Sequence, residues 1–183
     1  MVDLRLISNK QLTHLNKKLI TVDEISSEVM DIIRTVHDPE IPVLTVIDLG
    51  VVKKVTVEGK RVSINLTPTY SGCPAMDMIS DDLKSALKAE GYEAEIKLIL
   101  SPAWSTDMIT ETGRKAMEVY GIASPLEPSN DILALTEDAK IVPCTRCQSK
   151  NTKLVSQFGS TACKALFQCS DCHEPFDYFK CLK

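Results

Sequence analysis

Two short stretches near the end of the chain, CTRC at residues 144–147 and CSDC at residues 169–172, decide the fold of its C-terminal part. Each is a C-x-x-C unit, and 21 residues separate the two. One such unit places two thiolates on a tight turn, and two turns that face each other complete a tetrahedral sulfur site. The spacing therefore predicts a metal-binding β-ribbon at residues 144–183, with strands at 153–158 and 164–168. Its expected ligands are Cys144, Cys147, Cys169 and Cys172.

The cysteine count supports a metal site over a set of disulfides. The chain has seven cysteines, an odd number, and five of them lie between residues 144 and 172. In a reducing compartment such crowding is typical of metal binding. A Cys₄ ribbon favours zinc, which we expect here. An iron–sulfur cluster also suits four thiolates and stays the alternative.

Composition and charge bound the class of protein. The 183 residues suffice for one ordinary domain and a small second one, and 44% of them are hydrophobic. The net charge of −4 argues against broad nucleic-acid or membrane binding, because no large cationic face opposes phosphates. Five lysines near the C-terminus keep a nucleic-acid-binding ribbon as a lesser alternative. No signal peptide or apolar run of the roughly 20 residues that span a bilayer is evident, so we expect a cytoplasmic protein.

Upstream of the ribbon, the hydrophobic pattern predicts a two-layer α/β (α+β) domain at residues 22–125. Helices should cover one face of a three-stranded sheet that begins with a hairpin. Residues 1–21 are then an N-terminal extension and residues 126–143 a linker. The elements are expected in the order helix, strand, strand, helix, strand, helix, at residues 21–37, 51–58, 61–67, 74–90, 94–100 and 108–120.

Local signals mark the ends of these elements. Thr21 opens a T-x-x-E capping box, and Asp38-Pro39 ends the first helix because the residue before a proline disfavours the α region. Pro74 suits the first turn of the second helix. Gly121 should close the last helix.

Cys73 is the candidate functional residue of the first domain. It lies in Gly72-Cys73-Pro74, at the expected start of a helix, where unpaired N–H groups stabilise a negative charge. We therefore expect an acidified thiol that serves as a nucleophile or a metal ligand. The alternative is a buried small hydrophobic residue, since cysteine is often fully buried.

Three further residues are candidates for binding a metal or a partner. Cys163 follows a run of small residues, and Lys164 beside it would favour a thiolate. Asp38 and Glu40 flank Pro39 in a turn that we expect to be exposed and rigid, although they could also be solvated charges at a helix end. Cys181 and His173 are expected at terminal surface positions.

No Ser-His-Asp, phosphate-loop or H-E-x-x-H pattern occurs, so we expect no intrinsic catalysis.

Several motifs of residues 22–125 resemble the SufT-like iron–sulfur assembly domain. They are DPEIP at 38–42, DLG at 48–50, GCP at 72–74, SPAWSTD at 101–107 and Gly121-Ile122. The resemblance implies a small α/β domain in which Cys73 handles iron or an iron–sulfur cluster on its way to client enzymes. On this basis Cys73, Cys163, Asp38 and Glu40 are the candidate residues for iron or cluster handling.

The ribbon resembles that of the D-subunit family of bacterial phenylacetyl-CoA 1,2-epoxidases. The motifs are the two C-x-x-C units, FGSTACKAL at 158–166 and EPF at 174–176. This resemblance implies a non-catalytic subunit that matures the metal centres of a di-iron oxygenase or of an iron–sulfur flavin reductase in phenylacetate catabolism. A zinc-ribbon adaptor that docks these subunits without handling iron is the alternative. A homodimer stays open, and residues 1–20 match no motif of either family.

Overall fold

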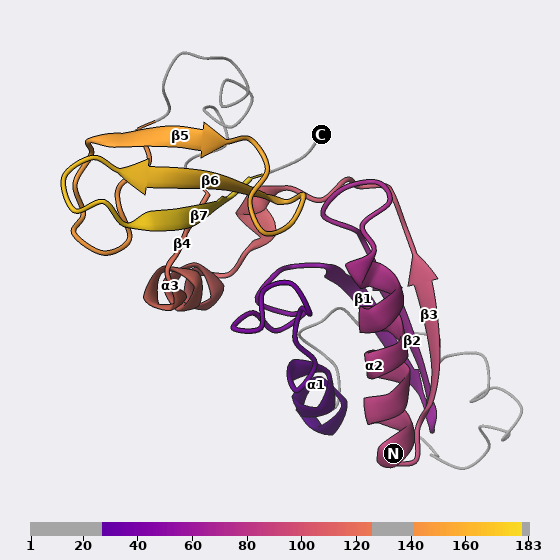
Figure 1. The fold of residues 1–183 in the computed structure, drawn as a ribbon. Coiled ribbons are helices and arrows are strands. Elements are labelled where there is room, and N and C mark those ends of the chain that lie inside the picture. Colours follow the sequence, from indigo (N-terminus) through magenta and orange to yellow (C-terminus); the bar gives the residue numbers. More distant parts are fainter. Residues whose placement is uncertain (1–26, 126–140, 181–183) are drawn as a thin grey trace, which may run out of the picture.

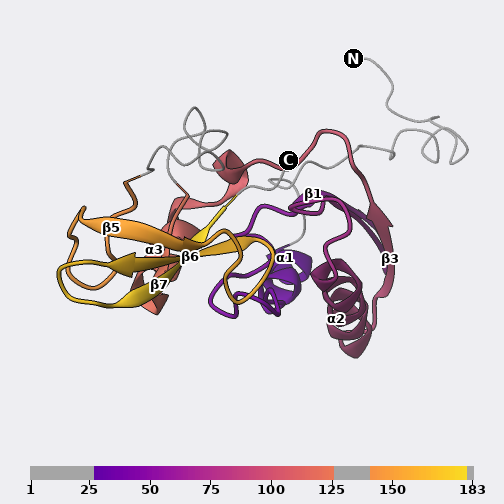
Figure 2. The ribbon, with the colours of Figure 1, turned by 45° about the horizontal axis from the view of Figure 1, so that its top comes forward.

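The computed structural model describes residues 27–125 and 141–180 (Figure 1). These residues form two lobes that lie side by side in both views, and residues 111–123, the end of the first domain, lie in the same lobe as the ribbon (Figures 1 and 2). The Thr21 capping box, the N-terminal extension, most of the expected linker and Cys181 lie outside the described residues. Within them, no helix is long and apolar enough to cross a membrane.

The first domain is built on a three-stranded sheet of order β1-β2-β3. β1 (Val52–Glu58) and β2 (Arg61–Leu66) form the expected antiparallel hairpin. The chain then passes through α2 (Ala75–Ala89) to β3 (Glu93–Leu98), which runs parallel to β2. The α/β expectation for this domain is therefore confirmed.

One face of this sheet packs against helices. Val62, Ile64 and Leu66 alternate along β2 and are buried, as their period of two predicts. The apolar stripe of α2, which includes Ile79 and Leu83, packs into the same core. α1 (Ser27–Arg34) lies beside α2 and buries Val29, Met30 and Ile33 there.

Two helix boundaries differ from the expected ones. α1 ends at Arg34 and not at Asp38, because His37 already pairs with Thr45 in a β-bridge. α3 (Glu111–Tyr120) begins after the expected Met108, because the Thr110 hydroxyl accepts the Gly113 N–H at 3.0 Å and caps the helix there. A 3₁₀ turn, η2 (Thr106–Met108), precedes it. Gly121 closes α3 in the left-handed conformation, with φ 96°, as expected.

The ribbon is a four-stranded sheet of order β4-β7-β6-β5. β5 (Thr152–Ser156) and β6 (Lys164–Cys169) are the two expected strands, whereas β7 (Pro175–Phe179) was not expected. β4 (Ile122–Ala123) follows α3 directly, yet it pairs with β7 in parallel. The last residues of the sequence-defined first domain thus complete the sheet of the ribbon.

The ribbon has a hydrophobic core of its own, but two of its residues extend the core of the first domain. Cys163 and Phe179 of the ribbon belong to the core cluster of the first domain. The rings of Trp104 and Phe179 meet edge to face, with centroids 5.9 Å apart. Because Trp104 also donates a hydrogen bond to the Leu49 carbonyl at 2.9 Å, the contact is anchored deep in the first domain.

Candidate metal centre and thiol cluster

The four cysteines of the two C-x-x-C units meet at one end of the ribbon. Their sulfur atoms all lie within 4.8 Å of one another, with Cys144 3.7 Å from Cys172 and Cys147 3.6 Å from Cys169. Four sulfurs that each lie about 2.3 Å from a central zinc ion stand about 3.8 Å apart. The spacing therefore fits a tetrahedral ion and is much too long for disulfides.

Both cysteine turns have the same backbone shape. The residue after each unit, Gln148 in one turn and His173 in the other, has a positive φ of 61° or 62°. His173 is exposed, as expected, but it also closes its turn in the left-handed conformation. Hydrogen bonding from the backbone N–H of Cys172 lowers the pKa of the Cys169 thiol to about 7, whereas the neighbouring thiols raise the pKa of Cys147 to about 12 and also contribute to a raised pKa of Cys172.

Polar side chains tie the two turns together. Asp171 accepts a hydrogen bond from the Asn151 side chain at 2.7 Å and another from Ser149. Arg146 forms an ion pair with Glu174 at 2.8 Å. These contacts link the two turns that carry the cysteines.

A second group of candidate residues meets where the ribbon contacts the first domain. The Cys163 thiol donates to Glu40 Oε2 at 3.4 Å, across 123 positions of the sequence. The buried Lys164 ammonium donates to the Glu40 carbonyl oxygen at 2.8 Å and to Ser160 Oγ at 3.0 Å. We call Glu40 and Cys163, together with Cys73, whose pKa the Glu40 charge raises, the thiol cluster.

Asp38 is a buried residue that holds the turn containing Glu40. It is only 6% exposed, so the expectation of an exposed, solvated Asp38 is wrong. Its Oδ1 accepts the backbone N–H groups of Glu40 at 2.8 Å and Ile41 at 2.7 Å. Burial raises the pKa of Asp38, and these two N–H groups oppose that shift. The residue orders the turn that presents Glu40.

The Cys73 thiol is half-buried at the start of α2, but it is not acidified as the sequence predicts. Burial raises its pKa, and the charge of Glu40 adds to the rise. The backbone N–H of Ala75 and the Thr69 side chain oppose these effects without overcoming them. The helix start is therefore outweighed by the loss of solvent.

Sequence reasoning missed Tyr70, which lies three residues before Cys73 in the same loop. Burial raises the pKa of Tyr70 to about 12, and the charges of Cys73, Glu40 and Cys163 contribute in the same direction. Its side chain is also hydrogen-bonded to Cys73. Tyr70 therefore touches the cluster from the Cys73 side and stays a neutral phenol there. Its position in the loop before Cys73 was the one available signal.

Cys163 is also not a thiolate, contrary to expectation. It is 4% exposed, and burial raises its pKa to about 12. Thr161 Oγ1 lies 3.0 Å away and lowers the pKa, while Glu40 raises it. Lys164 lowers it only weakly, because its ammonium is directed to the Glu40 carbonyl and to Ser160.

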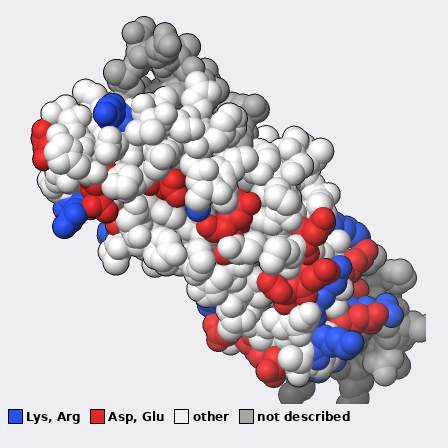
Figure 3. All heavy atoms as spheres, viewed as in Figure 1, with Lys and Arg blue, Asp and Glu red and all other residues white. Residues whose placement is uncertain are grey.

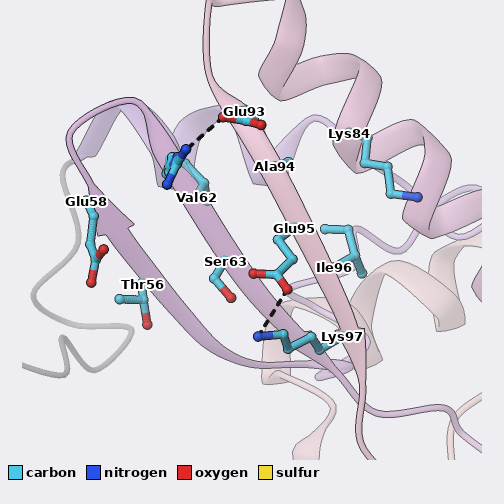
Figure 4. Close-up of a pocket in the computed structure, with 11 residues that line it drawn as sticks. Thr56, Glu58, Val62, Ser63, Lys84, Glu93, Ala94, Glu95, Ile96 and Lys97 are labelled. Atoms are coloured by element: carbon cyan, nitrogen blue, oxygen red, sulfur yellow. Dashed lines mark ion pairs between the residues drawn. The ribbon is translucent and has the colours of Figure 1, made fainter.

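Three hollows of the described surface are lined by no cysteine, although two of them include neighbours of the thiol cluster. One hollow on the first sheet is lined by charged side chains that already pair, Arg61 with Glu93 at 3.4 Å and Glu95 with Lys97 at 3.1 Å (Figure 4). It contains no thiol. Two others flank the cluster, one lined by Glu40, Lys164 and Phe158 and the other by Tyr70 and Trp104.

Comparison with known protein families accounts for both parts of the chain. Residues 26–98 match the model described as iron-sulfur cluster assembly protein, and residues 128–180 match the PaaD zinc beta ribbon domain. Together with the four-cysteine cluster, these matches define a SufT-like iron–sulfur assembly domain that carries a zinc ribbon.

One relative covers most of the chain. The putative D subunit of the 1,2-phenylacetyl-CoA epoxidase of Escherichia coli is 45% identical over 156 residues, which is 85% of this chain and 92% of that protein. The chain therefore belongs to the PaaD family, the D subunits of phenylacetyl-CoA epoxidases.

Two shorter relatives match the first domain alone. An Fe-S protein maturation auxiliary factor of Porphyromonas gingivalis is 34% identical over 100 residues, which is 53% of this chain and 91% of that protein. The auxiliary factor SufT of Staphylococcus aureus is 33% identical over 87 residues, or 46% of this chain and 98% of that protein. The expected combination of a SufT-like domain and a PaaD ribbon is confirmed.

Proposed function

We propose that this protein is a non-catalytic accessory subunit of the phenylacetyl-CoA 1,2-epoxidase system. It delivers iron or an iron–sulfur cluster to the di-iron oxygenase or to the iron–sulfur flavin reductase during phenylacetate catabolism. Membership of the PaaD family supports the link to the epoxidase. The SufT-like domain, whose shorter relatives are named maturation factors, supports the role in metal delivery.

The observation that carries the proposal is the position of Cys73. The thiol is half-buried, adjoins a hydrogen-bonded tyrosine and experiences the charge of Glu40. A thiol near a carboxylate offers ligands for iron, whereas a nucleophile needs a neighbouring base to activate it. Burial raises the pKa of Cys73, and the charges of Glu40 and Asp38 add to the rise, which disfavours a thiolate nucleophile. The same carboxylates attract a cation, whose charge would in turn favour the thiolate.

The ribbon cysteines have a separate, structural role in this proposal. Cys144, Cys147, Cys169 and Cys172 hold zinc, which supplies the folding energy of a ribbon with a small core. Six unpaired thiols in the described residues require a reducing environment, and we place the protein in the cytoplasm on that ground.

A docking role without metal delivery is the second candidate. The outer strand β5 and the loop after it expose Leu154, Val155 and Phe158 by 44%, 53% and 63%. Charged side chains are sparse over the ribbon in Figure 3 and crowd over the first domain. Exposed apolar side chains favour a protein–protein contact, so an adaptor would dock epoxidase subunits through the ribbon.

Co-expression distinguishes the two roles. The epoxidase subunits are produced with the wild-type protein, with Cys73→Ala, or with Ser71→Ala as a matched control in the same exposed loop. Iron and sulfide are then measured in each purified subunit. Delivery predicts metal-poor client polypeptides with Cys73→Ala, whereas zinc content and fold of the variant persist. Equal iron loading and turnover with Cys73→Ala would reject delivery and favour the adaptor.

A further inference from the structure

A hollow between the ribbon and the end of α3 is built from both parts of the chain. β4 brings the end of α3 alongside β7, so α3 lies next to the ribbon sheet (Figure 1). The turn that contains Glu40, the end of α3, the loop after β5, and residues of β6 and β7 line the hollow between them. We call it the ribbon hollow, and its charged and exposed aromatic side chains are Glu40, Tyr120, Phe158, Lys164, Glu174 and Asp177.

We propose that the ribbon hollow is the docking site for a segment of an epoxidase subunit that carries a lysine or arginine next to an apolar side chain. This inference rests on the proposed function, which makes the epoxidase subunits the partners of the chain. It deepens that function, because it gives the place at which a subunit binds and the chemistry that selects it. The site is separate from Cys73, which does not line the hollow.

Two exposed aromatic side chains from distant elements provide the apolar part of the hollow. Tyr120, at the end of α3, is 56% exposed, and Phe158, after β5, is 63% exposed. The Lys180 ammonium lies 4.3 Å from the centroid of the Phe158 ring, so this ring is held in place by a cation–π contact. Leu166 and Pro175 also line the hollow. Aromatic side chains in a concave surface are the anchors that protein interfaces favour.

The charge of the hollow is negative. Its charged groups are the carboxylates of Glu40, Glu174 and Asp177 and one ammonium, that of Lys164. The Lys164 side chain is buried, and it donates to the Glu40 carbonyl oxygen and to Ser160. The hollow therefore presents carboxylates, and not a cation, to a partner. Interfaces are complementary in charge, so the partner segment is basic.

Two of the three carboxylates remain open to a cation. Glu174 is already in an ion pair, whereas no ion pair within the described residues involves Glu40 or Asp177. Asp177 accepts the neutral hydroxyl of Ser160 at 2.9 Å, and the Glu40 carboxylate accepts a thiol at 3.4 Å. A lysine or arginine side chain suits this hollow, because it can pair with a carboxylate through its charge and with an aromatic ring through a cation–π contact.

Binding of the purified epoxidase subunits tests the site. The di-iron oxygenase and the iron–sulfur flavin reductase are each titrated by calorimetry into the full-length, zinc-loaded protein. We expect one of them to bind, with an affinity that falls as the salt concentration is raised, because salt screens the charges. Tyr120→Ser should weaken binding by more than about tenfold, since tyrosine is frequent among the residues that dominate interface energies. Asp177→Asn keeps an acceptor for Ser160 and removes the charge, so it should weaken binding by about tenfold.

The same helix offers matched controls outside the hollow. Val119 adjoins Tyr120 and is 90% exposed, and Glu118 is an exposed carboxylate, yet neither residue lines the hollow. Val119→Ser and Glu118→Gln should therefore bind as the wild type does. Zinc content and circular dichroism establish that each variant is folded. Tyr120 and Asp177 lie outside the thiol cluster, so their variants leave its residues intact.

Several results would overturn the proposal. Wild-type affinity of both Tyr120→Ser and Asp177→Asn would do so, as would binding of neither subunit or equal losses in the two control variants. A loss with Tyr120→Ser alone would mean that the partner segment is apolar without the cation. Self-association that Tyr120→Ser abolishes, without subunit binding, would make a second copy of the chain the occupant. Subunit binding that tightens when residues 1–20 are deleted would make the chain's own N-terminal residues the occupant.

Iron loading of the subunits on co-expression is measured separately, so failure of the docking site and failure of delivery are distinguishable. Loading that requires the wild-type protein, together with unchanged binding by the hollow variants, leaves delivery standing and rejects this docking site. Weakened binding by the hollow variants, together with loading that does not require the protein, supports the docking site and rejects delivery.

Discussion

The Cys73 thiol lies where backbone N–H groups at the start of α2 point toward negative charge. This favourable term is present, since the Ala75 N–H lowers the pKa of Cys73, but burial and Glu40 raise it by more. The effect of the helix start on the pKa of Cys73 can be predicted from the sequence, because the residues involved are neighbours in the chain. The effect of Glu40 cannot be predicted in this way, because Glu40 lies 33 positions away and approaches Cys73 only after folding.

This balance predicts the reactivity of Cys73. Because its pKa is raised, the thiolate fraction at neutral pH is smaller than in a free cysteine, and alkylation should be slow until the pH exceeds about 8.5. The rate is measured against pH in zinc-loaded protein with Cys163 and Cys181 replaced by serine. Glu40→Gln should move the midpoint down, since the Glu40 charge raises it. A midpoint below about 8.5 before that change would contradict the assignment.

Asp38 gives a prediction for stability. Asp38→Ala leaves the N–H groups of Glu40 and Ile41 without their acceptor, so the free energy of unfolding should fall by about 1–3 kcal/mol. Asp38→Asn keeps an oxygen in the same place and should cost less. Urea unfolding of both variants gives the comparison. If both variants lose the same free energy of unfolding, Asp38 stabilises the fold through its charge and not through its hydrogen bonds to the turn.

At the scale of elements, the sequence predicted the strands and helices that have a regular hydrophobic pattern. It did not predict short strands or pairings between distant parts of the chain. The alternation of Val62, Ile64 and Leu66 revealed β2 because one face of the strand is buried. β4 has only two residues and no period, and β7 begins at Pro175, a residue that disfavours strand assignments. The ribbon cysteines were found because metal-ligand spacing is local. The meeting of Glu40 with Cys163 depends on the docking of the two parts.

The ribbon predicts a selective response to loss of its metal. Chelation, or Cys169→Ser, should unfold the ribbon while the helices of the first domain persist, because zinc coordination supplies its folding energy. Trp104 is the chain's one tryptophan and packs on Phe179 of β7, so its emission should shift to longer wavelength as that contact opens. Far-ultraviolet circular dichroism follows the helices in the same sample. A metal-free ribbon with unchanged Trp104 emission would refute the structural role of zinc.

At the scale of the whole molecule, the ribbon is bound to the first domain by contacts of several kinds. The Trp104–Phe179 ring pair is apolar, the Lys164–Glu40 contact is a charge-assisted hydrogen bond, and β4 is continuous with α3 of the first domain. α3 itself is anchored to the first domain, since Thr110 donates to Asp48 at 2.6 Å. We therefore expect the two parts of the zinc-loaded protein to unfold as one cooperative unit.

Lys164→Met tests this coupling, because it retains most of the side-chain volume and removes the ammonium that holds Glu40. Unfolding should become easier by about 1–3 kcal/mol, since the Glu40 carbonyl loses its partner. The Trp104 signal at the interface should then change before the circular dichroism of the first domain, whereas the two coincide in the wild type. Lys180→Met is the matched control, because Lys180 is a buried lysine of the ribbon that bonds Gln157 within the ribbon. Coincident transitions in Lys164→Met at the wild-type midpoint would mean that this bond does not couple the two parts. Separated transitions with zinc retained would show that the Lys164–Glu40 hydrogen bond holds the ribbon against the first domain.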